Sequence, residues 1–374
     1  MTFHSPPLRI AIVGGGAAGF FAAIRAKEVA PHAEVTIYEK ASRPLMKVAL
    51  TGGGRCNLTN SFADIKDLKQ VYPRGDKWLK RLFKRFDDKD AYAWFETHGV
   101  PLVTQDDGCV FPKAQDAMRI VDCLVMTAKR LGVNILCKHA LSGIVPMEDG
   151  GFELQFSQAS PAFADRLVLT TGGAPKSEGH AMLAALGHDI VPPVPSLFTF
   201  TVSDEGLRAL MGLVVEEAAL SIPGTKYAAR GALLLTHWGT SGPATLRLSA
   251  YAARYLAEQA YRAPLAINWF GTFSQEEVRL QLSKFARHSP QKQLSSLRPE
   301  GLQLRLWHYL LKRAGLPSDK RWGELGKKPF NKLLETLTND LYAITARGTW
   351  KEEFVTCGGI ALNSVNPNTL MSKQ

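Results

Sequence analysis

The chain has 374 residues, a length that suits one large domain with an insert, or two domains, rather than one small module. Hydrophobic residues make up 45% and charged residues 21%, a globular composition that excludes disorder, collagen and coiled coil as the main state. The five cysteines are odd in number and show no CxxC spacing. This argues against a disulfide framework or a cysteine zinc site and predicts a cytoplasmic protein.

The formal net charge is +11, and the basic excess is concentrated in two stretches. Residues 279–332 hold thirteen Lys and Arg against three Asp and Glu, and residues 66–89 hold nine against four. Such a chain can meet nucleic acid, an anionic membrane or an anionic cofactor. No apolar run is long enough to predict a transmembrane helix. The uncharged stretch 10–24 faintly resembles a signal-peptide core, but its glycines favour a strand, a turn and a helix.

The first forty residues predict a strand–helix–strand unit. Residues 8–13 are a short apolar run that ends at glycines, which is typical of a buried parallel strand. Residues 17–29 are alanine-rich and predict a helix that Pro31 ends. Residues 34–39 alternate and are β-branched, which indicates a second strand.

The next 130 or so residues predict a continuation of the same α/β pattern. Asp149-Gly150 lies between two apolar runs and predicts a hairpin. The other expected elements are, in chain order, a glycine-rich loop over 42–61, helices near 76–86 and 88–98, an extended segment at 108–112, a long helix over 114–131, a strand at 134–138 and a strand at 166–171 that ends at paired glycines.

The sequence changes character at Pro192, Pro193 and Pro195, and we predict a domain boundary there. The part that follows is β-rich over 194–240 and helical over 243–340, which indicates a mixed insert. Its predicted elements are strands at 198–202, 214–222 and 232–235, a helix over 243–261 and a basic, leucine-rich helical stretch over 274–340; a strand at 353–356 then ends at Gly358-Gly359.

The strongest motif is Gly14-x-Gly16-x-x-Gly19, which follows a predicted strand and opens a predicted helix. Glu39 ends the next strand twenty residues later, and this full context is typical of a dinucleotide-binding fingerprint. Gly14 would permit the tight turn, Gly16 the approach of a pyrophosphate to the helix N-terminus, and Gly19 close packing of helix on strand. Glu39 would accept ribose hydroxyls, and its charge disfavours the 2′-phosphate of NADP. The alternative is a plain glycine turn.

Two further glycine clusters are candidates for the same ligand. The first is Thr51-Gly52-Gly53-Gly54-Arg55-Cys56-Asn57. Its glycines would let the backbone lie directly against a flat or anionic group. Arg55 could form an ion pair with phosphate, and Asn57 could form a hydrogen bond with a ring edge. A mobile surface loop is the alternative. Thr170-Thr171-Gly172-Gly173 ends a predicted parallel strand, at the edge where open α/β sheets bind ligands. Here the alternative is a simple exit from strand to loop.

Other chemistry-bearing residues favour structural roles. Cys56 lies beside Arg55 but has no second cysteine close in sequence, so a structural thiol is the safer interpretation. His237 in THWGTSGP is expected to be a hydrogen-bonded loop residue rather than a substrate contact. The aromatic residues of the basic helical stretch are expected in a core, with its Lys and Arg on a solvated face, although a nucleic-acid face stays open.

Taken in order, several segments resemble the BaiN/RsdA-type NAD(P)/FAD-dependent oxidoreductases. They are RIAIVGGGAAG, YEKASRPLMKVALTGGGRCNLTN, DDGCVFP, TTGGAPKSEGHAMLAALGH, VPPVPSLFTF, THWGTSGPATLRLS and FVTCGGIALNSVNPNTLMSK. The resemblance covers nearly the whole chain, and the GGGRCNLTN segment is specific. It implies the α/β fold of a Rossmann-like FAD-binding domain, of the two-dinucleotide-binding-domain flavoprotein type, interrupted by a β-barrel-plus-helical insert domain. The expected ranges are 1–193 with 350–374 for the FAD-binding domain and 194–349 for the insert.

The resemblance also implies FAD as the cofactor and NAD(P)H as the electron donor. Carried over by motif, the ADP half would be held by Gly14, Gly16, Ala17, Ala18, Gly19 and Glu39. The flavin side would be lined by Gly53, Gly54, Arg55, Cys56 and Asn57, with Thr171, Gly172 and Gly173 beside them. Leu141, after the third strand, would offer backbone to adenine. No catalytic residue and no metal ligand is assigned.

Two features depart from the family pattern. Cys109 stands before VFP, where the family often has arginine. The family also continues past the NPNTLMSK segment into a glycine-rich stretch that closes over the flavin, whereas this sequence ends at Gln374. If that stretch is lacking, we expect weak, easily dialysed FAD, impaired activity and some self-association.

The function predicted from the sequence is therefore a cytoplasmic FAD-dependent oxidoreductase that passes hydride from NAD(P)H through flavin to an unsaturated small-molecule acceptor. Two alternatives stay open. One is a flavin-containing RNA-binding or RNA-modifying protein, although nucleic acid is not the expected partner. The other is a truncated flavoprotein without activity. The substrate and the oligomeric state do not follow from the sequence.

Overall fold

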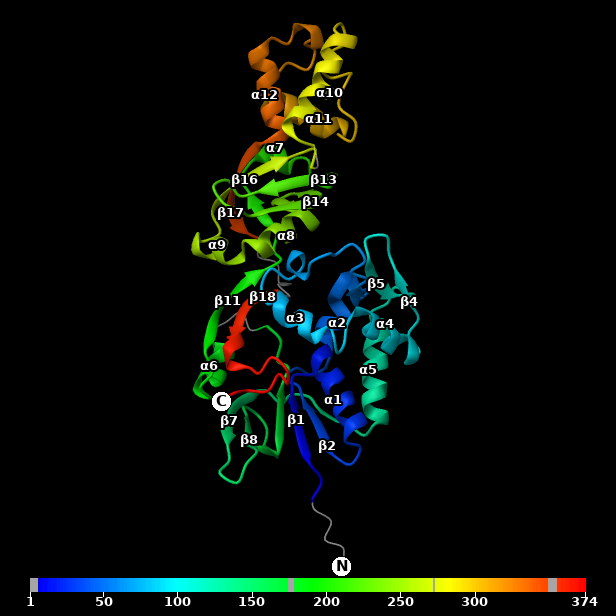
Figure 1. Cartoon of the computed structure of the whole chain (residues 1–374), viewed down its shortest axis with the longest axis vertical. Helices are drawn as coiled ribbons and strands as arrows, with labels where there is room; N and C mark the ends of the chain where they lie inside the picture. Colours follow the sequence, from blue (N-terminus) through cyan, green and yellow to red (C-terminus); the bar gives the residue numbers. More distant parts are fainter. Residues whose placement is uncertain (1–5, 174–177, 272, 349–354) are drawn as a thin grey trace, which may run out of the picture. The chain divides into compact units, whose positions relative to one another are not determined.

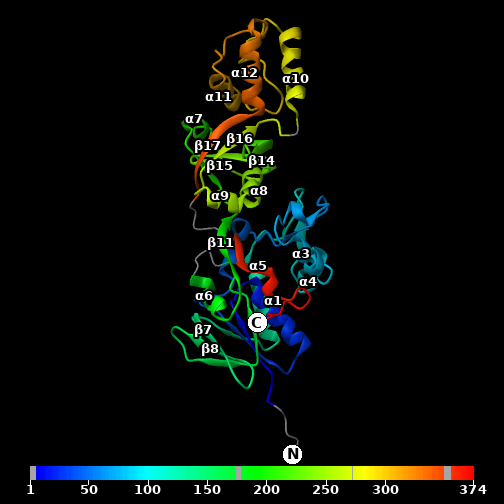
Figure 2. The same cartoon turned by 60° about the vertical axis from the view of Figure 1, so that its left-hand side comes forward.

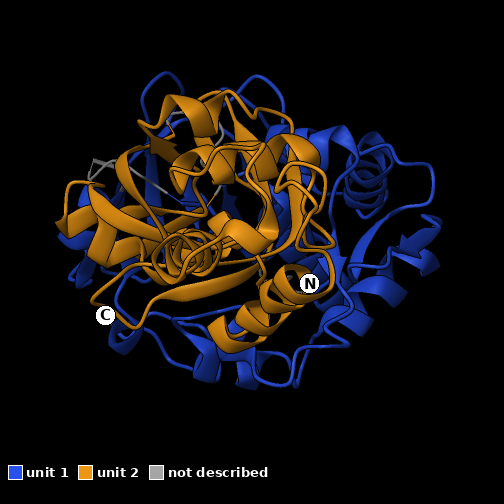
Figure 3. Ribbon diagram, turned by 90° about the horizontal axis from the view of Figure 1, so that it is seen from above, with its two compact units in different colours: residues 1–191, 359–374 blue, residues 192–358 orange. Residues whose placement is uncertain are grey.

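The computed structural model describes residues 6–173, 178–271, 273–348 and 355–374, which form two compact units. Unit 1 comprises residues 1–191 and 359–374, and unit 2 comprises residues 192–358 (Figure 3). The boundary expected from sequence lay at 193/194 and 349/350. Unit 2 is thus inserted into unit 1, and the chain passes between them in two strands that pair with each other, β11 (Ile190–Ser196) and β18 (Val355–Ile360).

The centre of unit 1 is a parallel sheet with the strand order β10-β1-β2-β6. Its strands are β1 (Arg9–Val13), β2 (Glu34–Tyr38), β6 (Asn134–Leu136) and β10 (Arg166–Leu169). Val13 is in register with Tyr38 on one side and with Leu169 on the other. The strands therefore end level, and the residues that follow them, Gly14, Glu39 and Thr170, gather at one edge of the sheet.

Each face of this sheet is covered by a different layer (Figure 1). Helices α1 (Ala17–Val29) and α5 (Met118–Arg130) contact each other and pack against Ile12 of β1. The opposite face, with Ala11 and Val13, packs against an antiparallel sheet of β7 (Leu141–Pro146), β8 (Phe152–Phe156) and β9 (Ala162–Ala164). Alternate residues of one strand thus enter two cores, as the pleat of a strand requires.

Smaller elements complete unit 1. A second antiparallel sheet has the order β3-β5-β4. Its strands and the remaining helices are α2 (Met46–Leu50), a 3₁₀ turn at Thr51–Gly54, β3 (Thr59–Asn60), a 3₁₀ turn at Leu68–Gln70, α3 (Asp76–Leu82), α4 (Asp88–Thr97), β4 (Leu102–Thr104), β5 (Cys109–Pro112), α6 (Glu178–Ala185) and a 3₁₀ turn at Leu362–Ser364.

Unit 2 is built on a closed barrel with the strand order β12-β15-β14-β13-β16-β17. The strands are β12 (Phe200–Val202), β13 (Val214–Ser221), β14 (Ala228–Thr236), β15 (Gly239–Ser241), β16 (Ala263–Asn268) and β17 (Asp340–Arg347). The helices of this unit are α7 (Glu205–Arg208), α8 (Pro243–Tyr251), α9 (Ala253–Glu258), α10 (Gln275–His288), α11 (Leu304–Arg313) and α12 (Lys327–Thr338), with a 3₁₀ turn at Trp322–Glu324.

Helices α10, α11 and α12 form a layer at one end of the barrel (Figure 2). Trp307 and Trp322 are fully buried there and stack with ring centroids 6.3 Å apart. Leu306, Leu310 and Leu333 pack in the same core as the barrel residues, so barrel and helices share one hydrophobic core.

The fold class expected from sequence is confirmed, and several element boundaries differ. The predicted loop 42–61 contains helix α2, and the predicted helix 114–131 begins only at Met118, because Gln115 has a left-handed φ of 54°. Strand β16 lies inside the stretch predicted to be helical, and the helix predicted over 243–261 breaks into α8 and α9. Residues 353 and 354 of the last predicted strand lie outside the described residues, and β18 follows directly. No described helix has the length and apolarity to span a bilayer.

A buried ion network joins the barrel to the helical layer of unit 2. Arg313 of α11 forms ion pairs with Asp204 at 3.0 Å and with Asp340 at 2.5 Å, and the Asp340 side chain is only 5% exposed. Its guanidinium also lies over the ring of Tyr342, 4.1 Å from the centroid. Tyr342 and Trp269 donate hydrogen bonds to the same Asp340 oxygen. The buried carboxylate is thus fully partnered.

We expect Arg313→Met to destabilise unit 2 by about 2–4 kcal/mol, because it leaves a buried carboxylate without its cation. Arg279→Met is the matched control, since Arg279 pairs with Glu276 on an exposed helix surface and such pairs contribute about 0–1 kcal/mol. Urea unfolding followed by tryptophan fluorescence measures both. Equal unfolding midpoints for the two variants would contradict the structural role of the network.

Candidate functional site

The turn after β1 is shaped by Gly14. Its φ of +112° is a conformation that favours glycine, and a Cβ there would collide with the carbonyl oxygen of Thr170. Its N–H donates to the carbonyl of Tyr38 at 2.8 Å. The Thr170 hydroxyl lies 3.0 Å from the Val13 carbonyl oxygen and 2.9 Å from that of Gly14. Three neighbouring strands are therefore tied together where the glycine turn begins.

Gly16 is the N-cap of α1, and its backbone is extended. No side chain caps this helix, and Ala17 and Ala18 of the first turn are exposed. A Cβ built on Gly16 would meet no atom of the described residues within 4 Å. The N–H groups and positive dipole end of α1 therefore face open space, an arrangement suited to an anionic ligand.

Gly19 serves the packing of α1 on the strand. A Cβ at this position would fall on the carbonyl oxygen of Gly14 and would lie 2.8 Å from the Thr170 hydroxyl. The residue is buried. The helix can approach the turn this closely only because residue 19 has no side chain.

Glu39 follows β2 and turns its carboxylate toward the glycine turn. One oxygen accepts the N–H of Gly15 at 2.7 Å and the other accepts the N–H of Ala41 at 2.7 Å. A Cβ on Gly15 would lie 2.9 Å from the Glu39 Cβ, so a glycine between the first two glycines of the motif favours this contact. Two further lone-pair directions on the carboxylate remain for ligand hydroxyls.

The second glycine cluster is joined to the first by backbone. The N–H of Leu45 donates to the Gly15 carbonyl at 2.8 Å, and Leu45, with a left-handed φ of 59°, starts α2. The turn at 51–54 follows directly, with positive φ at Gly52, Gly53 and Gly54. Within residues 6–173, 178–271, 273–348 and 355–374, a Cβ at Gly53 or Gly54 would meet no atom closer than 4 Å. The two motifs predicted from sequence are thus brought together in unit 1.

The side chains after this turn point to different surroundings. The exposed Arg55 guanidinium lies 4.4 Å from the Phe111 ring centroid, and its Nε donates to the Gly52 carbonyl at 3.2 Å. Cys56 is 4% exposed and belongs to the hydrophobic core that also contains residues of α1 and α5, so only its backbone can face a ligand. Asn57 is exposed, with its amide nitrogen 3.5 Å from the Cys109 sulfur.

The third cluster lies at the end of β10. Thr171, Gly172 and Gly173 are exposed and follow the strand at the same edge as Gly14. Leu141 begins β7 and pairs with Phe156. The segment just before it is held to the end of β2, where the N–H of His139 donates to the Glu39 carbonyl at 2.9 Å.

Sequence reasoning missed two apolar residues beside the second glycine cluster, which begins at Thr51. Met46 and Leu50 of α2 are 53% and 58% exposed, and α2 has no buried residue. Together with the glycines of the 51–54 turn they present an apolar surface to which a flat ring can pack. The signal available in the sequence was the apolar stretch MKVAL at 46–50 directly before the glycines, but the prediction treats it as part of a loop.

Two cysteines near the glycine clusters, Cys56 and Cys109, do not have the lowered pKa of an activated thiol. Burial raises the pKa of the Cys56 thiol, and a hydrogen bond with Thr51 opposes this only in part. Burial also raises the pKa of Cys109, and Asp107 adds to the effect. His237 in unit 2 is exposed and meets Trp238 edge to face, with ring centroids 4.4 Å apart.

The family model described as HI0933-like protein Rossmann domain matches residues 8–374. The chain belongs to this family. The match includes every glycine cluster described above and the whole of unit 2, so family membership rests on both units and not on the nucleotide-binding motif alone.

Curated relatives span nearly the whole chain. The sequence is 26% identical over 384 residues to the 3-dehydro-bile acid delta(4,6)-reductase of Clostridium scindens, covering 98% of this chain and 90% of that protein. It is 25% identical over 374 residues to the ribosomal RNA dihydrouridine synthase of Escherichia coli K12, with 97% and 88% covered. A likeness to a solved 3-ketosteroid-delta4-(5alpha)-dehydrogenase from Rhodococcus jostii RHA1 is more distant, with a TM-score of 0.42 and 18% identity over 96% of this chain and 86% of that one.

We expect Gly19→Ala to destabilise unit 1 by about 1–3 kcal/mol, because the added methyl must push α1 away from the Gly14 carbonyl. A gain in helix propensity of about 1 kcal/mol works against this effect. Thermal unfolding followed by circular dichroism measures the balance. A melting temperature equal to or above that of the unmodified chain would show that the contact can relax without cost.

Native Cys56 is expected to react with iodoacetamide at pH 7.5 at least ten times more slowly than the half-buried Cys137. The thiolate is the reactive form, and burial raises the pKa of both thiols, so the expected difference in rate comes from access: Cys56 is 4% exposed, whereas Cys137 is half-buried. The Cys56 rate should climb only above the ordinary thiol range, at about pH 8.5. Mass spectrometry of labelled peptides measures each site, with urea-unfolded protein as the control. Rapid labelling of Cys56 at neutral pH would instead indicate a thiolate activated by Arg55.

Proposed function

We propose that this chain is an FAD-dependent oxidoreductase, with unit 1 as the FAD-binding domain and unit 2 as the insert domain. The observation that carries the proposal is the arrangement of the glycine clusters at the carboxyl edge of the parallel sheet, where such sheets bind dinucleotides. The family supports a Rossmann-type cofactor site, and the named reductase relative supports oxidoreductase chemistry in general.

The residues present fit the cofactor. The open space above Gly16 and the uncapped N-terminus of α1 suit a pyrophosphate, with Ala17 and Ala18 as the adjoining N–H donors. Glu39 would accept ribose hydroxyls on its remaining lone pairs, and its charge would repel a 2′-phosphate. The backbone near Leu141 would border the adenine end.

The flavin end would lie over the second cluster. Gly53 and Gly54 would allow a flat ring to approach the backbone, and Met46 and Leu50 would pack against it. Arg55 and Asn57 offer polar contacts at the rim, Cys56 contributes backbone only, and Thr171, Gly172 and Gly173 would border the opposite side.

The bound flavin would supply the capacity to take hydride from NAD(P)H and to pass it to an organic acceptor. The chain would hold and orient the cofactor and shield it from water. We further propose a small molecule with a conjugated, unsaturated bond as the acceptor. The support is the name of a curated relative, the 3-dehydro-bile acid delta(4,6)-reductase.

FAD binding is tested by reconstitution followed by gel filtration and an absorption spectrum. We expect a flavin spectrum at about one FAD per chain, followed by anaerobic bleaching with NADH or NADPH and recovery on adding a conjugated enone. Failure to retain flavin at any FAD concentration would contradict the assignment of the cofactor. Retention without bleaching would contradict the proposed donor alone.

We expect Gly16→Val to lose at least ten-fold in FAD affinity while the chain stays folded. The valine would fill the space that the pyrophosphate needs, and its Cβ would have no neighbour within 4 Å in the part of the chain that the structure describes. Gly326→Val is the matched control, since Gly326 is an N-cap glycine with extended backbone in unit 2. Flavin content and circular dichroism are measured together. Full flavin content in the folded Gly16 variant would overturn the site.

A second candidate function is a flavoprotein that acts on RNA. It is favoured by the dihydrouridine synthase relative and by the exposed cations of the helical layer, such as Lys284, Arg305 and Lys327. Against it, Trp307 and Trp322 are in the core and cannot stack on bases. Labelled ribosomal RNA fragments titrated at 50 and 200 mM salt, roughly bracketing physiological ionic strength, should show a steep salt dependence if this function applies. Absence of binding at the lower salt would remove it.

A further inference from the structure

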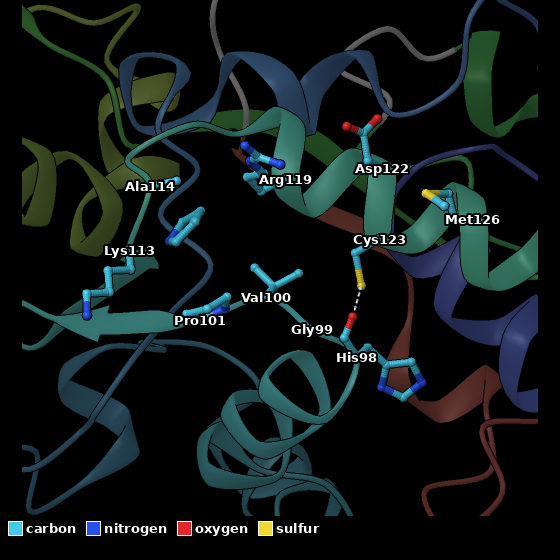
Figure 4. Close-up of a pocket in the computed structure, with 11 residues that line it drawn as sticks. His98, Gly99, Val100, Pro101, Lys113, Ala114, Arg119, Asp122, Cys123 and Met126 are labelled. Carbon is cyan, nitrogen blue, oxygen red and sulfur yellow. Dashed lines mark hydrogen bonds between the residues drawn. The ribbon is translucent and has the colours of Figure 1, made fainter.

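Unit 1 contains a cavity that shares no lining residue with the proposed FAD site (Figure 4). Its volume is about 510 Å³, within the range of small-molecule sites. Three segments line it: the connection from α4 to β4, the end of β5, and one side of α5. Too small for a dinucleotide, the cavity suits a ligand of one or two rings.

The walls of this cavity are largely apolar. Val100, Pro101, Pro112 and Ala114 line it, and Met126 adds a flexible side chain that is 69% exposed. A flexible methionine at the mouth of a hollow adapts readily to apolar ligands.

Two side chains of the wall, Cys123 and His98, already have partners within the protein. The Cys123 thiol contacts the His98 carbonyl at 3.8 Å, and burial raises its pKa, so it is a neutral wall atom. The His98 ring stacks on Trp94 with centroids 3.9 Å apart, and its Nδ1 lies 2.7 Å from the Trp94 carbonyl. That carbonyl can only accept a hydrogen bond, so Nδ1 carries the proton. Stacking and hydrogen bond together hold the ring in place.

Two cations reach the cavity from different elements. Lys113 follows β5 and Arg119 belongs to α5, and both are exposed. Neither side chain forms an ion pair or hydrogen bond with another residue in the described part of the chain. Asp122 also lines the cavity, one helical turn after Arg119, and places a single negative charge there.

We propose that this cavity binds a small amphipathic anion, a carboxylate or sulfonate on an apolar one- or two-ring body. The body would occupy the apolar floor formed by Val100 and Pro101, and the anionic group would lie between Lys113 and Arg119. Two positive charges repel each other, and neither has a negative partner in the described part of the chain. An anionic group placed between them would therefore be attracted by both. A neutral molecule of the same shape would gain only the apolar contacts.

The cavity wall also borders the glycine loop. The N–H of Ala117, just before α5 begins, donates to the Gly54 carbonyl at 2.8 Å. The segment between the lining residues Ala114 and Arg119 thus contacts the second glycine cluster, while no lining residue belongs to the proposed FAD site.

The test uses 2-naphthoate and its neutral analogue 2-naphthalenemethanol with the full chain in isothermal titration calorimetry. We expect the anion to bind at least five-fold more tightly than the alcohol. The double variant Lys113→Glu with Arg119→Glu should weaken naphthoate at least ten-fold, and Asp122→Asn should strengthen it about two-fold. Lys129→Glu is the control: this residue is exposed on the last turn of the same helix, does not line the cavity, and should leave naphthoate affinity unchanged.

A cavity-filling variant distinguishes the cavity from a general basic surface. Ala114→Trp should abolish naphthoate binding while circular dichroism stays unchanged, because Ala114 is exposed and its larger side chain would enter the hollow. Equal affinity for acid and alcohol, or full binding in the Ala114 variant, would overturn the proposal. Flavin content plays no part in these readouts, so their failure is distinct from failure of the proposed function.

Discussion

The approach of α1 to the backbone of Gly14 is the contact on which unit 1 depends. With no side chain at residue 19, the helix lies directly against the turn that ends β1, and the Thr170 hydroxyl closes the same point from β10. Three glycines, Gly14 to Gly16, separate the end of β1 from the start of α1, and Glu39 accepts the N–H of the middle one. A side chain at either glycine would separate helix and sheet, and the open space above Gly16 would no longer adjoin the other glycine clusters.

Backbone hydrogen bonds carry this arrangement outward from the first turn. The Leu45 N–H reaches Gly15, the Ala117 N–H reaches Gly54, and the His139 N–H reaches the Glu39 carbonyl. Each link joins segments that are distant in sequence, and none requires a particular side chain. The candidate site is therefore mainly a backbone surface, which is suited to a ligand with many phosphate and ring oxygens and explains why it holds so few charged residues.

Unit 2 is stabilised by a different principle. Its barrel and helical layer share one apolar core, and the charges that enter it are paired around Asp340. The basic residues of the helical stretch stay at the surface, whereas the two tryptophans lie inside. Net charge and aromatic content, which together suggested a nucleic-acid face, are thus separated in space, and only the charge remains available to a partner.

The sequence by itself determined the parallel α/β unit and the glycine motif with its acidic partner, because these depend on local periodicity and on glycine spacing. Helix α1 was predicted at its observed ends, Ala17 and Val29. Tertiary structure alone decided that α2 forms inside a glycine-rich loop, because a left-handed Leu45 is held there by the carbonyl of Gly15. It also decided that β16 completes a barrel within a stretch of helical pattern, since its partners β13 and β17 lie far away in sequence. The cavity beside α5 likewise exists only where three separate segments meet, and no local pattern encodes such a meeting.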